Sequence, residues 1–168
     1  GVDSLTGGAA THDTISGGGG IDTLVYTGGS DTLNGGAEVD VYDINALGTS
    51  AAHATVTSTV AGETIDLAGI IDAGTLANVD YAAGATWQAQ EITLGSSATL
   101  ANYLDASAAA DGNGGNEILS WFEFGGDSYV VMDNTAGATF AATDGVVQIG
   151  GTGVLDDAAA ADGVITLA

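Results

Sequence analysis

The chain of 168 residues contains 22 acidic residues and neither lysine nor arginine, so its formal net charge at pH 7 is -22. This charge disfavours nucleic acid and anionic membrane surfaces as partners and favours cations or a basic partner. Hydrophobic residues nevertheless make up 45% of the chain and the mean hydropathy is +0.30, which argues against the composition of a disordered protein. The absence of cysteine excludes disulfides and thiolate metal sites.

A repeat occupies the first part of the chain. Aspartate recurs at intervals of ten, nine, nine and nine residues, at Asp3, Asp13, Asp22, Asp31 and Asp40. A large apolar or aromatic residue follows two positions after each, at Leu5, Ile15, Leu24, Leu33 and Tyr42. Glycine pairs precede several units, at Gly7 with Gly8, Gly17 with Gly18, and Gly35 with Gly36. Each unit is therefore predicted to be a turn followed by a very short strand, and neighbouring units must stack to share a core.

If each unit forms half of a coil, one circuit takes about 18 residues, and turns on one side stack at ~4.8 Å. Asp3, Asp22 and Asp40 then lie on one side, and Asp13 and Asp31 on the other. Carboxylates stacked this closely repel by about 1 kcal/mol per pair even at the dielectric constant of water, and the chain has no basic side chain to place between them.

A divalent cation with oxygen ligands fits these groups, because carboxylates and turn carbonyls are hard ligands. Calcium is favoured over magnesium, since it accepts more oxygens in a more flexible geometry. The spacing predicts up to three sites between turns, from the pairs Asp3 with Asp22, Asp13 with Asp31, and Asp22 with Asp40. His12 is expected to be a solvated turn residue, and His53 an ordinary exposed one.

The segment GGGGIDTLV, residues 17 to 25, matches the calcium-binding nonapeptide G-G-x-G-x-D-x-U-x at every specified position, and so resembles the RTX (repeats-in-toxin) family. The resemblance implies a parallel β-roll. It implies turn residues at Gly17, Gly18 and Gly20 and at Gly35 and Gly36, and carboxylate ligands at Asp3, Asp13, Asp22, Asp31 and Asp40. Three departures are visible: a ten-residue unit from Gly7, Tyr26 and Thr27 in place of a glycine pair, and Glu38 in place of the third glycine.

The nine-residue spacing ends after Asp43, which predicts a boundary between a roll at residues 1–47 and a second domain at residues 48–168. Residues 48–61 and 62–70 alternate as half-buried strands do, with Ile65 and Leu67 on one face. Leu100, Tyr103, Leu104 and Ala108 have helical spacing, with Ser97 as a possible N-cap and Gly112 as a stop.

Two strands are predicted at Ile118 to Phe124 and Ser128 to Met132, joined by a Gly-Gly-Asp turn, and a third at Val146 to Ile149. Their aromatic residues are expected to form a core. Asp133, Asn134 and Asp144 are either another cation site or the polar residues of a loop. The predicted fold class is thus all-β: a short parallel β-roll of nonapeptide repeats, followed by a mainly β C-terminal domain with one short helix.

The segments FEFGGDSYVVMDN and TDGVVQIGGTG are similar to the region that follows RTX repeats at the carboxyl end of type I secreted bacterial proteins, including surface-layer and hydrolase examples. The terminal GVITLA resembles the uncleaved export end of such proteins. These resemblances imply a calcium-binding C-terminal module of a secreted, extracellular or cell-surface protein, exported by type I machinery and folding when it meets calcium outside. The alternative is a calcium-dependent structural subunit of an extracellular assembly, which would self-associate or attach to a bacterial surface.

No catalytic site and no organic cofactor are expected. The sequence has no Ser/His/Asp spacing, no phosphate-binding loop and no zinc motif, and its only imidazoles are His12 and His53. With no lysine or arginine, the usual side chains for activating a nucleophile and for stabilising an oxyanion are missing.

Overall fold

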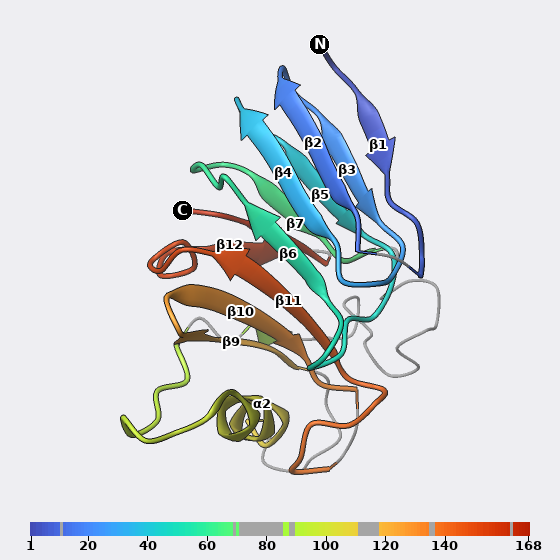
Figure 1. Cartoon of the computed structure of the whole chain (residues 1–168). Coiled ribbons are helices and arrows are strands. Elements are labelled where there is room, and N and C mark those ends of the chain that lie inside the picture. The colour runs from blue at the N-terminus through green and yellow to red at the C-terminus, as the bar shows by residue number, and fades with distance from the viewer. Residues whose placement is uncertain are drawn as a thin grey trace.

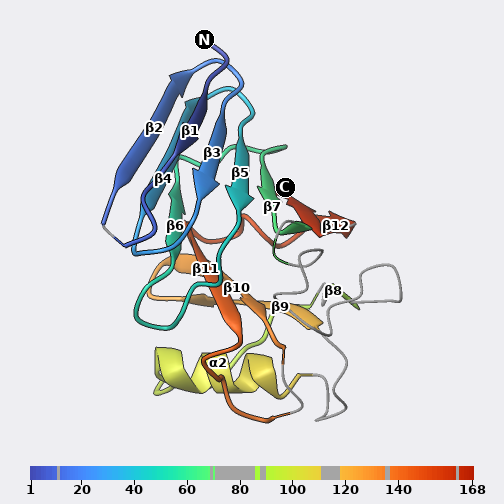
Figure 2. The same cartoon turned by 90° about the vertical axis from the view of Figure 1, so that its right-hand side faces the viewer.

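The computed structural model describes residues 1–10, 12–68, 70, 86–87, 90–110, 118–134, 137–161 and 163–168. Two β-sheets face one another at the N-terminal end, and a helix covers the far end of the molecule (Figures 1 and 2). The predicted fold class is confirmed: the protein is mainly β, with a parallel β-roll followed by further strands and a short helix.

The six-stranded sheet contains, in spatial order, β1 (Ser4–Thr6), β3 (Thr23–Tyr26), β5 (Val41–Ile44), β7 (Thr64–Asp66), β13 (Val164–Thr166) and β12 (Ala159–Ala161). The seven-stranded sheet contains β2 (Thr14–Gly19), β4 (Thr32–Ala37), β6 (Ala54–Thr57), β11 (Gly145–Gly150), β10 (Asp127–Met132), β9 (Ile118–Phe124) and β8 (Thr86–Trp87). Consecutive strands of the roll alternate between the two sheets.

The repeat sets the register of the roll. Thr14 lies opposite Thr32 in the β2–β4 pair, and Thr23 lies opposite Val41 in the β3–β5 pair, so a circuit takes 18 residues. Both pairs are parallel, as stacked turns require. The apolar member of each unit points inward, and Leu24 is completely buried. The predicted two-sided stack is therefore the arrangement that the chain adopts.

The parallel stack runs beyond residue 47. Strand β6 pairs in parallel with β4, and β7 pairs in parallel with β5, although the connection between β5 and β6 is longer than those before it. The alternation expected for residues 62–70 is confirmed, since Ile65 and Leu67 are completely buried while Thr64 and Asp66 are half-buried. The roll thus gains one more strand in each sheet than the nine-residue spacing indicates.

The strands of the C-terminal half extend the same two sheets. Strand β11 adds in parallel to β6, and β13 adds antiparallel to β7. Leu24 in the roll and Trp121 in β9 belong to one continuous cluster of buried residues. Within this half, β9 and β10 form the predicted hairpin, whose turn has positive φ at Gly125 (68°) and Gly126 (100°).

Helix α2 (Leu100–Ala108) packs against β9 and β10, where Leu104, Phe122 and Val131 form a second buried cluster (Figure 2). The predicted N-cap at Ser97 is wrong. Thr99 caps the helix instead: its side chain accepts a hydrogen bond from Asn102 N, and the Asn102 side chain accepts one from Thr99 N. The predicted stop at Gly112 lies outside the described residues.

Candidate metal centre

The repeat aspartates form the two predicted rows. In the first row, Asp22 Oδ1 accepts a hydrogen bond from Asp3 N at 2.8 Å, and Asp40 Oδ1 accepts one from Asp22 N at 2.8 Å. In the second row, Asp31 Oδ1 accepts a hydrogen bond from Asp13 N at 2.9 Å. Each carboxylate therefore reaches back to the turn stacked before it, and the three predicted pairs are the pairs that stack.

Three of these carboxylates are removed from water. Asp22, Asp31 and Asp40 are each 0% exposed. Their Oδ2 atoms are buried and have no hydrogen-bond partner among the residues that the structure describes. A buried ionised carboxylate is costly unless it is paired or coordinates a metal, so these three oxygens require a partner.

Glycine leaves the space that these oxygens face. A Cβ atom at Gly17 would collide with Asp22 Oδ2, one at Gly35 would collide with Asp40 Oδ2, and one at Gly7 would lie 2.7 Å from Asp31 Oδ2. The same Cβ position at Gly17 lies 2.8 Å from Gly35 O in the next turn. A carbonyl oxygen and a carboxylate oxygen therefore both lie next to the space that the missing glycine side chain leaves, which we call a glycine notch. Carboxylate and carbonyl oxygens are the ligands that calcium takes.

The other predicted glycines shape the turns. Gly18, Gly20 and Gly36 have φ values of 94°, 111° and 106°, in the region that side chains rarely adopt. Glu38 occupies the place that Gly20 has in its own unit, and it also has a positive φ of 79°. Glu38, which replaces the third glycine of its unit, therefore adopts the backbone conformation that glycine has at this position.

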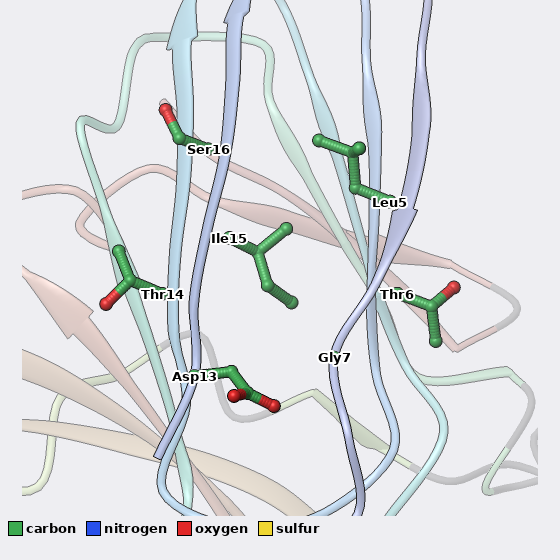
Figure 3. Close-up of a pocket in the computed structure, with 7 residues that line it drawn as sticks. All are labelled: Leu5, Thr6, Gly7, Asp13, Thr14, Ile15 and Ser16. Atoms are coloured by element: carbon green, nitrogen blue, oxygen red, sulfur yellow. The ribbon is translucent and has the colours of Figure 1, made fainter. Parts of the chain in front are cut away.

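Asp3 and Asp13 belong to the first coil and are more exposed than the aspartates that follow them. Gly8 N donates a hydrogen bond to Asp13 Oδ2 at 2.8 Å. A cavity of about 440 Å³ opens here between β1 and β2, and the side chains of Leu5, Asp13 and Ile15 point into it (Figure 3). This cavity is the open end of the roll.

The first row has a further member that sequence reasoning missed. Thr64 N donates to Asp40 O, as Val41 N does to Asp22 O, which places Glu63 one turn after Asp40. Glu63 is 0% exposed. Burial, together with the neighbouring Asp40 charge, raises the pKa of its carboxyl from 4.5 to about 7, although hydrogen bonds with Val60 N and the Tyr42 hydroxyl act to lower it.

Glu63 was missed because the longer connection before β6 breaks the nine-residue spacing. A signal was present nevertheless: Glu63 stands two positions before the buried Ile65, just as each aspartate stands two positions before its core residue.

Two tyrosine hydroxyls lie beside the rows. Tyr42 Oη accepts a hydrogen bond from Gly35 N at 3.2 Å, and lies 3.2 Å from Thr57 O and 3.4 Å from Glu63 Oε1. Burial and the Glu63 charge raise the pKa of Tyr42. Burial and the Asp31 charge raise the pKa of Tyr26 to about 12. Both hydroxyls therefore stay protonated and neutral near pH 7.

The structure gives Asp144 a role in its own loop. Its Oδ1 accepts a hydrogen bond from Asn134 N at 3.0 Å and its Oδ2 accepts one from Ala141 N at 2.6 Å. These bonds are those of a polar loop between β10 and β11, one of the two interpretations of Asp133, Asn134 and Asp144. In the part of the chain that the structure describes, no group of three or more histidine, aspartate or glutamate residues gathers as a metal-binding cluster.

The histidines lie apart from the rows. His12 is exposed, as expected. The expectation that His53 is an ordinary exposed residue is wrong: it is half-buried, with Nδ1 at 2.9 Å from Thr49 O and Nε2 at 3.1 Å from Gln148 Oε1. It thus links the connection after β5 to β11.

No model of a known protein family matches the chain, and no curated protein matches it at a significant level. No helix among the described residues is long and apolar enough to cross a membrane.

Proposed function

We propose that this protein is a calcium-binding module whose folding is completed by calcium. The observation that carries the proposal is the set of buried Oδ2 atoms of Asp22, Asp31 and Asp40, which have no hydrogen-bond partner among the described residues and face glycine notches in stacked turns. The chain has no lysine or arginine to neutralise them. Calcium bound between successive turns would supply the missing charge.

The metal would be held by the paired aspartates of the two rows and by carbonyl oxygens of the glycine turns, Gly35 O among them. These donors are all oxygens, and calcium prefers such ligands in flexible geometry. When bound, calcium supplies positive charge between carboxylates that otherwise repel. The chain itself supplies the parallel pairing of strands, which sets the spacing of those carboxylates.

This chemistry suits a protein that is exported unfolded. Sites with dissociation constants of about 10⁻⁴ to 10⁻³ M are empty at cytosolic calcium and filled outside the cell. Each filled site then adds stability by mass action, on the order of RT ln(1 + [L]/Kd). Together with the resemblance to RTX repeats, this supports a C-terminal module of a type I secreted extracellular protein, with no catalytic activity of its own.

The test is a calcium titration of the full chain by circular dichroism, from chelator to about 10 mM calcium. We expect a cooperative gain of β-structure, a weaker response in Asp31→Asn, and a wild-type response in Asp157→Asn. The last variant removes the same charge from an exposed loop residue outside the rows. A chain that is fully folded in chelator and does not respond to calcium contradicts the proposal.

The second candidate function is a structural subunit of an extracellular assembly. It is favoured by the open end of the roll, where β1 and β2 are the terminal strands of their sheets among the described residues. Val2 and Ile21 near this end are 82% and 58% exposed. Unpaired strand edges next to apolar side chains are a template for association.

Sedimentation velocity over the same titration separates the two candidates. A monomer at every calcium concentration supports the export and folding module. Growth into large species with calcium favours the assembly subunit, and the paired replacement Val2→Asn with Ile21→Asn is then expected to reduce that growth while the circular dichroism response persists.

A further inference from the structure

Glu63 continues the first row of carboxylates beyond the repeat. Strand β7 pairs in register with β5, with Thr64 opposite Val41, just as Val41 lies opposite Thr23 one turn earlier. The residue before each of these three strand positions is acidic: Asp22, Asp40 and Glu63. The turn that carries Glu63 is therefore equivalent in position to the turns proposed to bind calcium, although it does not follow their sequence pattern.

The Tyr42 hydroxyl lies between the carboxylate of Glu63 and the preceding turn, which contains Gly35. Glu63 Oε2 accepts a hydrogen bond from Val60 N at 3.0 Å, while Oε1 lies 3.4 Å from Tyr42 Oη. The Cβ position at Gly35 lies 2.7 Å from the same Tyr42 Oη and in contact with Asp40 Oδ2. The Asp40 and Glu63 carboxylates thus approach one hydroxyl from two successive turns.

The buried Asp40 Oδ2 atom indicates that a ligand is missing between Asp40 and Glu63. Asp40 is 0% exposed, its Oδ1 is already bonded to Asp22 N, and its Oδ2 has no hydrogen-bond partner in the described part of the chain. Two buried carboxylates with a neutral hydroxyl between them need a positive charge, and no basic side chain exists to supply it.

From this arrangement we propose that Asp40 and Glu63 form one further calcium site, at the junction between the repeats and the C-terminal strands. The oxygens nearest to it are Asp40 Oδ2, Glu63 Oε1 and Tyr42 Oη, with Thr57 O beside the hydroxyl. These are hard oxygen donors of the kind that calcium takes. The inference rests on the proposed function because it assigns the same cation, and it extends the row to a residue outside the nonapeptide pattern.

The experiment counts calcium ions bound to the full chain near pH 7, by native mass spectrometry and isothermal titration calorimetry. The variants are Glu63→Gln, which keeps size and hydrogen-bonding capacity, Asp22→Asn within the repeats, and Asp157→Asn as the charge-matched control in an exposed loop. We expect Glu63→Gln to bind one calcium ion fewer than the wild type, and Asp157→Asn to bind the wild-type number.

A wild-type ion count and wild-type affinities in Glu63→Gln, with fewer ions or lower affinities in Asp22→Asn, overturn this inference and leave the proposed function standing. A wild type that binds no calcium overturns both. If Glu63→Gln does not fold, Tyr42→Phe decides, because it keeps both carboxylates. An affinity loss of about tenfold at one ion supports the site, and unchanged affinities overturn it.

Discussion

Asp43 and Asp66 lie directly opposite one another on neighbouring strands β5 and β7, on the outer face of the six-stranded sheet. Burial raises the pKa of Asp43 above its ordinary value of 3.8, and the Asp66 charge raises it further, while a hydrogen bond with Asn45 lowers it. Like charges directly across a strand pair are destabilising. This pair therefore opposes folding once both carboxylates are ionised.

The pair gives stability a pH dependence. Because the pKa of Asp43 is higher in the folded protein, its contribution to stability is fully present below pH 3.8 and is lost as pH rises through the raised pKa. We expect Asp43→Asn to be more stable than the wild type at pH 7, and the difference to shrink towards pH 4. Thermal melting of both proteins at one saturating calcium concentration measures it, and a difference that does not depend on pH contradicts this explanation.

Glu38 is a second residue whose conformation has a cost. Its φ of 79° lies in the left-handed region, where a side chain costs ~1 kcal/mol relative to glycine. Glu38→Gly is expected to raise the free energy of unfolding by about this amount. Glu38→Ala removes the same charge but keeps the strain, so it serves as the control in chemical denaturation. Equal stabilisation by both variants assigns the effect to charge and not to the backbone.

At the scale of elements, the N-terminus of α2 shows how a local pair of hydrogen bonds selects one of two possible capping residues. Ser97 and Thr99 are both good capping residues, and Ser97 was the predicted cap. Asn102 decides between them, because it stands three positions after Thr99 and completes a reciprocal pair of hydrogen bonds with it. The helix therefore starts at Leu100 and presents Leu104 to Phe122 and Val131.

The cap predicts a matched pair of variants. Thr99→Ala is expected to lower the free energy of unfolding by ~1 kcal/mol, since it leaves Asn102 N without its acceptor. Ser97→Ala is expected to change it by less than about 0.5 kcal/mol, as surface substitutions usually do. Urea denaturation of both variants measures the difference, and a larger loss in Ser97→Ala would refute the assignment of the cap.

For the whole molecule, the central feature is the continuity of the core. Leu33 in the roll and Trp121 in the C-terminal half belong to one buried cluster, and both sheets run from the repeats into the later strands. Strand β13, close to the carboxyl end, pairs with β7 and buries Ile165. The repeats and the C-terminal strands therefore stabilise one another.

This continuity predicts coupled unfolding. Leu33→Ala in the roll is expected to cost ~2–5 kcal/mol. Tryptophan fluorescence reports on Trp87 and Trp121, which both pack in the shared core. We expect Leu33→Ala to shift the unfolding midpoint measured by fluorescence as much as the midpoint measured by circular dichroism. Two midpoints that separate in this variant would show that the halves unfold independently.

The sequence by itself determined the roll and its rows. With two nine-residue units in each circuit, an inward residue at a fixed offset places Asp22 against Asp40 and Asp13 against Asp31 without knowledge of the rest of the chain. The hairpin between β9 and β10 was equally predictable, because its two strands are adjacent and its Gly-Gly turn requires positive φ.

Only the tertiary structure decided where the row ends and which strands extend the two sheets beyond it. The longer connection before β6 removes the period, so the place of Glu63 after Asp40 depends on strand pairing and not on spacing. Likewise, β11 joins β6 and β13 joins β7 across large distances in sequence, because the roll leaves one edge of each sheet open at this end. Periodicity carries local information, whereas pairing at an open edge depends on which distant strand can bury its apolar face there.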